Sequence, residues 1–178
     1  MAVFLFMLMA KEARKAIKRK VNEELELMIK SIKFNNPGIS EEILEAFRIC
    51  DRKFFVKAIN AYPYDDLPQH VAHGQTISQP STIARMIRLL RLEQGMDVLE
   101  VGANTGYHAS LVAWLVWPGK VTTIEIFPDL AEMARKNIKD LIKNLKKTNK
   151  QEAKKFEKIE VIAGDALDKT TKIWQSKY

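Results

Sequence analysis

The chain has 178 residues, of which 47% are hydrophobic, enough for one domain with its own core or for one domain with a small N-terminal extension. Its formal net charge of +7 permits contact with nucleic acid, but much of the excess lies in two lysine-rich runs, "KEARKAIKRK" and "KNLKKTNKQEAKKFEK", which are typical of solvated surface. We therefore do not expect nucleic acid as the principal partner.

The single cysteine, Cys50, cannot form an internal disulfide, which favours a reducing compartment, so we expect a cytoplasmic protein. Cys50 lies in the apolar pattern "EEILEAFRIC" and is expected to be a small buried side chain. The three histidines, His70, His73 and His108, show no metal-ligand spacing and have no cysteine near them. No metal site is therefore expected.

The first ten residues, "MAVFLFMLMA", are apolar but too short to span a bilayer, and they lack a basic region and a cleavage site. We expect them to pack on the domain, or translation to begin at Met7 or Met9, and we predict no targeting role and no membrane partner. Residues 11–34 are predicted to form a helix, because apolar side chains recur on one helical face at Ile17, Val21, Leu25, Met28 and Ile32.

A second helix is predicted for "EEILEAFRIC", with Ser40 as its N-cap, after a break at "NNPG". The aromatic, proline-containing segment "RKFFVKAINAYPYDDLPQHVA" is expected to be extended and packed. A third helix follows "HGQTISQP" and carries Ile83, Met86, Ile87 and Leu90 on its apolar face. Pro80 suits its first turn, and Ser78 is a candidate N-cap.

Alternating strands and helices follow. Strands are predicted for "DVLEV", "VTTIEI" and "IEVIAGD", with helices for "YHASLVAWLV" and for residues 128–147 between them, and the lysine-rich stretch 146–158 is expected at the surface. This alternation is typical of a parallel α/β sheet with right-handed crossovers. Ligands of such sheets bind beyond the carboxyl ends of the strands, where this chain places Gly102, Glu125 and Asp165.

The loop "GANTG" after the first strand lacks both the G-x-G-x-x-G fingerprint and a Walker phosphate loop. Glu125 follows about twenty residues later, the distance at which a carboxylate can accept hydrogen bonds from ribose hydroxyls. Asp165 could reach an adenine amino group, and Glu100 could hold an amino group near the loop. A ligand with adenine, ribose and an amino-acid tail but no phosphates satisfies all three, and S-adenosylmethionine is that ligand.

The chain resembles the protein-L-isoaspartate O-methyltransferase family of class I S-adenosylmethionine-dependent methyltransferases over roughly residues 40–168. "VLEVGANTGYHAS", "VTTIEIFPDLAEMARKNI" and "VIAGDAL" resemble superfamily cofactor motifs, while "GQTISQP", with "RKFFV" and "AYPYDDLP" upstream, resembles elements specific to the family. The resemblance implies a Rossmann-like three-layer α/β sandwich with an N-terminal helical extension. We divide the chain into an N-terminal segment, 1–80, and a partial cofactor-binding domain, 81–178.

The resemblance also implies methyl transfer to the α-carboxylate of isoaspartyl residues in damaged proteins and peptides, with S-adenosylhomocysteine as the spent cofactor. Ser78 would be the catalytic residue facing the methyl donor and the substrate carboxylate, and Ile77 would help to build the same wall. The implied cofactor residues are Thr76, Glu100, Gly102, Ala103, Asn104, Gly106, Glu125, Ile126, Asp165 and Ala166, and the implied substrate residues are Val71, Ala72 and Ser78.

Three departures from the family pattern leave alternatives open. Asn104 stands at a position that is usually glycine, and "QHVA" at residues 69–72 replaces a Leu-Pro-Ile-Gly-like run that borders the substrate pocket. Only three of seven expected strands occur, so we expect the C-terminal half of the sheet to be missing, through a fragment, an interrupted gene or completion by association. The alternatives are a class I methyltransferase with another substrate, such as RNA, and a truncated non-catalytic relative.

Overall fold

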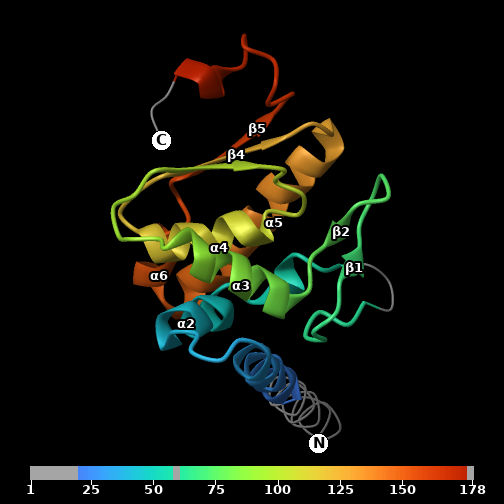
Figure 1. The fold of residues 1–178 in the computed structure, drawn as a ribbon, viewed down its shortest axis with the longest axis vertical. Coiled ribbons are helices and arrows are strands. Elements are labelled where there is room, and N and C mark those ends of the chain that lie inside the picture. Colours follow the sequence, from blue (N-terminus) through green and yellow to red (C-terminus); the bar gives the residue numbers. More distant parts are fainter. Residues whose placement is uncertain (1–19, 58–60, 176–178) are drawn as a thin grey trace, which may run out of the picture.

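The computed structural model describes residues 20–57 and 61–175 (Figure 1). Within the described part of the chain, residues 20–35 form the N-terminal helix. The other helices are α2 (Glu41–Ile49), α3 (Pro80–Leu90), α4 (Tyr107–Val116), α5 (Pro128–Thr148) and α6 (Lys150–Lys154), with 3-10 turns η1 (Arg52–Phe54) and η2 (Lys172–Gln175). The strands are β1 (Gln69–His70), β2 (Thr76–Ile77), β3 (Val98–Val101), β4 (Val121–Glu125) and β5 (Ile159–Ala163).

The main sheet has three parallel strands in the order β3-β4-β5. Val98 lies opposite Val121, and Val121 lies opposite Ile159, so the carboxyl ends of the strands meet at one edge. β4 is buried along its whole length because it pairs on both sides, whereas β3 and β5 are half-buried over most of their length. The predicted parallel α/β fold is confirmed.

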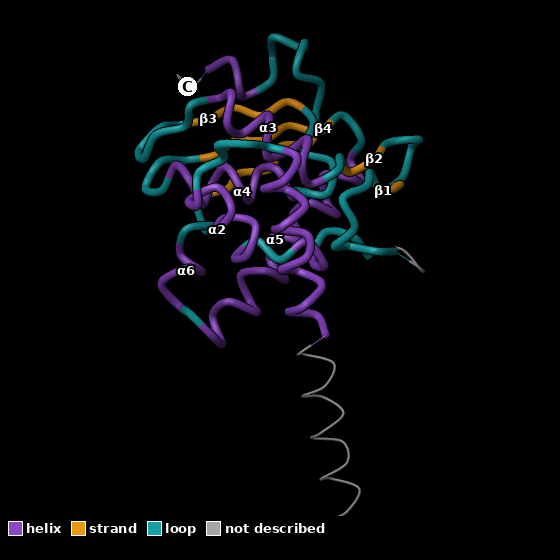
Figure 2. The backbone as a smooth tube through the Cα atoms, turned by 60° about the horizontal axis from the view of Figure 1, so that its bottom comes forward, coloured by secondary structure: helices purple, strands orange, loops and turns teal. Residues whose placement is uncertain are grey.

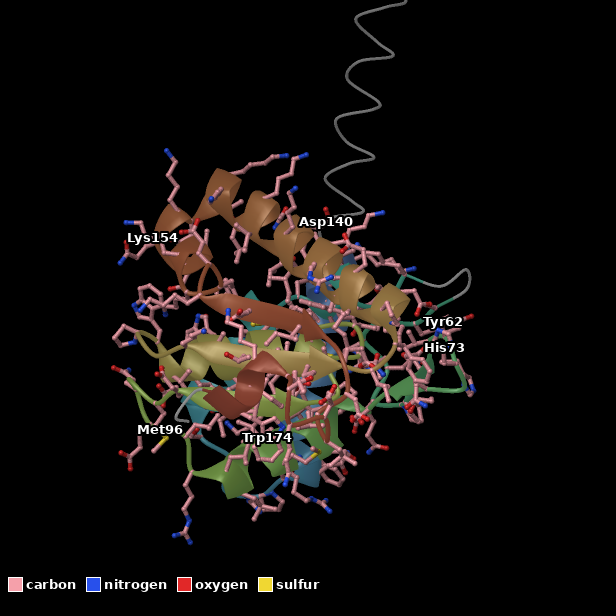
Figure 3. All side chains as sticks on the ribbon, turned by 90° about the horizontal axis from the view of Figure 1, so that it is seen from above. Tyr62, His73, Met96, Asp140, Lys154 and Trp174 are labelled. Atoms are coloured by element: carbon pink, nitrogen blue, oxygen red, sulfur yellow. The ribbon has the colours of Figure 1, made fainter. Side chains whose placement is uncertain are left out.

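The labelled helices gather on one side of these strands, as Figure 1 shows, and Figure 2 shows most of the helical segments (purple) below the strands (orange). Among the described residues, the opposite side is crossed only by the C-terminal segment that carries η2 (Figure 1). Figure 3, seen from above, labels Trp174 of η2 on this side of the sheet. Parallel sheets usually carry helices on both faces, so the part of the chain that the structure describes covers one face of its sheet with helices.

Helix α4 is the centre of the helical layer. Its sequence is apolar on all sides, and a helix of that kind is stable only when it is buried. Leu111 and Val116 are completely buried. At its start, the Tyr107 ring packs edge-on against Phe47 of α2, with ring centroids 6.1 Å apart. The N-terminal segment and the sheet region therefore share one core, and the division at residue 80 stays a prediction.

Several local predictions in the N-terminal part are confirmed, whereas the segment predicted to be extended begins with the 3-10 turn η1. Ser40 caps α2 by accepting a hydrogen bond from the Ile43 amide at 3.3 Å, and Cys50 is completely buried. Met28 and Ile32 are buried on the N-terminal helix, whereas Ile17 lies outside the described residues. No helix in residues 20–57 or 61–175 is long and apolar enough to cross a membrane, and the apolar stretch 1–10 lies outside these ranges.

Candidate functional site

The site begins at the loop between β3 and α4. Gly102 and Gly106 have φ angles of +94° and +84°, and Asn104 between them has +48°. Asparagine tolerates the left-handed region better than most residues, so the loop keeps its shape without a middle glycine. A Cβ atom placed on Gly102 would meet no atom within 4 Å. The space above Gly102 is therefore open to a ligand.

Glu125, at the end of β4, holds this loop in place. Its side chain is buried, and one carboxylate oxygen accepts a hydrogen bond from the Asn104 amide at 2.8 Å. The other oxygen accepts from the Phe127 amide at 3.2 Å. The sequence predicted a carboxylate for ribose hydroxyls here. The structure shows a second role for this carboxylate, which is to hold the backbone of the loop. Each of its oxygens has two lone pairs and uses one of them to accept a backbone hydrogen bond.

Glu100 on β3 is also engaged by the protein. Its Oε1 lies 2.7 Å from Nδ1 of His108 on α4, and its Oε2 accepts a hydrogen bond from the hydroxyl of Thr123 on β4. Neither partner of Glu100 was predicted from the sequence. The spacing of eight residues between Glu100 and His108 is not a helical contact distance, and the pair forms only because α4 folds back on the strand.

A cavity of about 240 Å³ opens at this loop. Its lining joins the segment from β2 to the start of α3 with the end of β3 and the loop; it consists of Thr76, Ile77, Ser78, Ile83, Met86, Glu100, Val101, Gly102, Ala103, Asn104, Thr105, Tyr107 and His108. The structure thus brings Ser78 and Thr76 together with the predicted residues Glu100 and Gly102–Asn104. The remaining predicted cofactor residues, Gly106, Glu125, Ile126, Asp165 and Ala166, lie outside this lining.

The β1–β2 hairpin, which leads into Ser78, is attached to the loop and to α5. The Asn104 side-chain amide donates a hydrogen bond to the Thr76 carbonyl at 3.2 Å. The His73 ring stacks on Phe127 with centroids 4.2 Å apart, and its Nε2 lies 2.8 Å from a carboxylate oxygen of Asp129. This contact lowers the pKa of Asp129 below its ordinary value. Figure 3 shows His73 at the side where α5 begins.

Ser78 is not the N-cap of α3, and that alternative is wrong. The N-cap is Gln79, whose side chain makes no capping hydrogen bond. The backbone amide of Ser81, in the first turn of the helix, instead donates a hydrogen bond to the Asp66 carboxylate at 2.8 Å. Ser78 lies before the helix in an exposed position, and its carbonyl accepts a hydrogen bond from Nη1 of Arg52 at 2.9 Å. Its hydroxyl is thus free of a capping role.

The predicted substrate residues Val71 and Ala72 line a second cavity, of about 370 Å³. It lies between the hairpin, the segment after η1 and α5, with Phe55 and Met133 among its walls. The two cavities share Ile77 and Thr105 in their linings. Ser78 lines the first cavity and not the second.

The carboxyl end of β5 carries Asp165 and Ala166, as predicted. Asp165 is exposed, and one of its carboxylate oxygens accepts a hydrogen bond from the Leu167 amide at 2.8 Å. The Gly164 amide donates to the Glu125 carbonyl at 2.9 Å, which ties the ends of β4 and β5 together. Within the described ranges, no group of three or more His, Cys, Asp or Glu side chains could hold a metal ion.

The parallel sheet, the left-handed loop after β3 and the acidic residues at neighbouring strand ends define a Rossmann-like α/β fold of the class I methyltransferase type. Residues 22–168 match the family model described as Protein-L-isoaspartate(D-aspartate) O-methyltransferase (PCMT), and the chain belongs to this family.

Sequence relatives agree with this assignment. The chain is 46% identical over 102 residues to a protein-L-isoaspartate O-methyltransferase from Methanothrix thermoacetophila, a match that covers 56% of this chain and 49% of the relative. It is 39% identical over 130 residues to protein-L-isoaspartate O-methyltransferase 2 from Archaeoglobus fulgidus, covering 72% of this chain and 53% of the relative. The chain therefore spans about half the length of these relatives.

A solved structure of a protein-L-isoaspartate O-methyltransferase superposes with a TM-score of 0.65 at 27% sequence identity. The superposition covers 79% of this chain and 42% of the solved chain. The predicted family and the Rossmann-like α/β fold class are thus confirmed, whereas the described residues form one helical layer on one face of the sheet and not the predicted three layers.

Proposed function

We propose that this chain provides the methyl-donor and methyl-acceptor site of a protein-L-isoaspartate O-methyltransferase, which transfers a methyl group from S-adenosylmethionine to the α-carboxylate of isoaspartyl residues. The observation that carries the proposal is the shared lining of the 240 Å³ cavity: Ser78, from the T-I-S element, faces the same space as Gly102 and Asn104 of the glycine loop. Family membership over residues 22–168 supports the same activity.

The residues present fit this cofactor. The open space above Gly102 admits a ligand close to the backbone. Glu125 ends β4 and Asp165 follows β5, and these neighbouring parallel strands meet at the same edge of the sheet. We assign the amino-acid tail to the loop and Thr76, the ribose to Glu125 and Ile126, and the adenine to Asp165 and Ala166. Ile126 is 59% exposed, so its side chain is accessible to a ligand beside the end of β4.

The proposed reaction requires little acid–base catalysis by the protein. The α-carboxylate of an isoaspartyl residue is ionised at neutral pH, so no strong general base is needed. The cofactor supplies an activated methyl group when bound. The protein has to align the attacking oxygen with that methyl group and to exclude water. The Ser78 hydroxyl suits this task, because it can donate one hydrogen bond to the carboxylate without adding charge.

The product of transfer is a methyl ester. Attack by the neighbouring backbone nitrogen expels methanol and forms a succinimide, which reopens partly to normal aspartate. The biological outcome would be repair of aged proteins, with isoaspartyl proteins and peptides as partners. The single, completely buried Cys50 suits a reducing compartment, and we propose a cytoplasmic location.

The test is transfer of labelled methyl from S-adenosylmethionine to an isoaspartyl peptide, with the matched aspartyl peptide as control. Base-labile label in the isoaspartyl peptide alone is the expected result. Ser78→Ala should lower kcat about tenfold or more, as expected for a group that orients a reactant, while Gln79→Ala should leave it within about twofold. Label in RNA, or cofactor binding without transfer to either peptide, would contradict the proposal.

A further inference from the structure

Arg52 is completely buried in η1, although a guanidinium is always charged in proteins. Within residues 20–57 and 61–175, Asp66 attracts it electrostatically but forms no ion pair with it, and its Nε has no hydrogen-bond partner. Burial lowers the pKa of Arg52 below its ordinary value. Burial of a cation without a bonded carboxylate costs folding free energy. The contacts that Arg52 does make therefore bear on why an arginine stands at this position.

The guanidinium joins two segments that are far apart in sequence. Nη1 donates a hydrogen bond to the Ser78 carbonyl at 2.9 Å, and Nη2 donates to the Leu67 carbonyl at 3.4 Å. The rigid, planar fork of arginine can reach two acceptors at once, which a lysine ammonium on a flexible stem does less well. Arg52 therefore sets the position of Ser78 relative to the Leu67 segment.

The same guanidinium lies over the Tyr107 ring, with Cζ 5.2 Å from the ring centroid. Tyr107 is buried, lines the 240 Å³ cavity and begins α4 directly after Gly106. A cation over a ring face is attracted by the ring quadrupole, and this attraction is larger when both are away from water. Arg52 thus connects Ser78 with the wall of the cavity formed by α4.

We infer that Arg52 is a positioning residue for methyl transfer, which acts through the Ser78 carbonyl to keep the Ser78 hydroxyl aimed into the cavity. This inference rests on the proposed function. Ser78 needs such a support, because it lies between β2 and α3, outside both elements. Asp66 fixes the start of α3 at Ser81, and Asn104 fixes β2 at Thr76, so the Arg52 bond completes the restraint at the residue between them.

The experiment compares Arg52→Met and Arg52→Lys with Arg48→Met as the matched control. Arg48 is a neighbouring arginine whose partners, Glu26 and Glu45, lie away from the cavity. Hydrogen exchange followed by mass spectrometry compares the exchange rate in residues 76–83 with the rate in α5. Steady-state kinetics with an isoaspartyl peptide gives kcat and KM. The dissociation constant for S-adenosylmethionine is measured in parallel.

We expect Arg52→Met to speed exchange in residues 76–83 about tenfold while α5 is unchanged, as loss of a hydrogen bond from a charged donor implies. We expect kcat to fall by about the same factor, with cofactor affinity within about twofold of the wild type. Arg52→Lys should restore part of kcat, because it retains one charged donor. Arg48→Met should change neither exchange in residues 76–83 nor kcat.

Equal exchange in residues 76–83 for Arg52→Met and Arg48→Met would overturn the inference, as would a normal kcat in both Arg52 variants. If Arg52→Met does not fold, Arg52→Lys decides by the same two readouts. If the wild-type chain transfers no methyl, the proposed function fails, while the exchange data still show whether Arg52 restrains Ser78.

Discussion

The carboxylate of Asp66 accepts hydrogen bonds from both the backbone amide and the hydroxyl of Ser81, so helix α3 is capped by a residue fifteen positions before Ser81. The residue at the N-cap position, Gln79, provides no side-chain bond. An anion at a helix start also interacts favourably with the exposed amides of the first turn. The cap therefore ties the "YPYDDLP" segment to the helix that follows the T-I-S element.

Replacing Asp66 should destabilise the fold. Loss of a capping side chain usually costs about 1–2 kcal/mol in the free energy of unfolding, and Asp66→Ala should show a loss of this size in urea denaturation. Asp65→Ala is the matched control, because Asp65 is exposed and the Ser81 amide does not bond to it. A loss as large in Asp65→Ala as in Asp66→Ala would show that net charge, rather than capping, is responsible.

The two glycines of the cofactor loop should respond differently to alanine. A Cβ atom on Gly106 would lie 3.0 Å from Cδ1 of Ile138 and 3.3 Å from Cα of Ala134, whereas one on Gly102 would meet nothing within 4 Å. Both substitutions carry a left-handed backbone cost of about 1–2 kcal/mol. Gly106→Ala should lose about 1–3 kcal/mol more through overpacking.

Thermal unfolding of both variants checks this difference, and titration with S-adenosylmethionine checks the site. Gly102→Ala should fold with the smaller loss of Tm but bind the cofactor more weakly, since its Cβ enters the open space above the loop. If Gly102→Ala lowered Tm as much as Gly106→Ala, backbone strain would outweigh the contact with Ile138.

Glu125→Ala should affect both the fold and cofactor binding. Two backbone amides, those of Asn104 and Phe127, would lose a charged acceptor, and hydrogen bonds of this type contribute about 1.5–3 kcal/mol each. Glu125→Gln keeps one side-chain acceptor and should fall between wild type and alanine in urea denaturation. Isothermal titration with S-adenosylmethionine should show weaker binding in both variants. Unchanged stability in Glu125→Ala would show that the loop holds its shape without this carboxylate.

Elements whose signal lies in the local sequence were predicted well. The strand predicted for residues 121–126 and the helix predicted for residues 128–147 correspond closely to β4 and α5. Helix α6 was missed, because the lysine-rich run around it was interpreted only as surface. Its start is nevertheless marked locally, since the Asn149 side chain accepts hydrogen bonds from the amides of Gln151 and Glu152.

Elements whose cause lies in tertiary contacts were not predictable from the sequence. The β1–β2 hairpin has two residues in each strand and is held at its ends by contacts with Asn104 and Asp129. At the site, the residue types at the strand ends were predicted. Their partners were not, because pairs such as Glu100 with His108 depend on how a helix folds back on a strand.

The contact between His73 and Asp129 should make the stability of the hairpin depend on pH. His73 holds the pKa of the Asp129 carboxyl below its ordinary value, so the ionised carboxylate is favoured in the folded state. The stabilisation is therefore fully present above the unfolded carboxyl pKa of about 3.9. It is lost as the pH falls through the lowered folded value.

Asp129→Asn removes this contribution and should lower Tm relative to wild type at pH 5 to 6, with a difference that shrinks as the pH falls below about 4. Glu132→Gln is the matched control on the same helix, because Glu132 pairs with Arg135 and lies away from His73. Tm measured across this pH range for the three proteins checks the prediction, and hydrogen exchange in residues 69–77 localises it. A difference that grew toward acid pH would have the wrong sign for a carboxyl with a lowered pKa, and the stabilisation would then have to come from the stacking of His73 on Phe127.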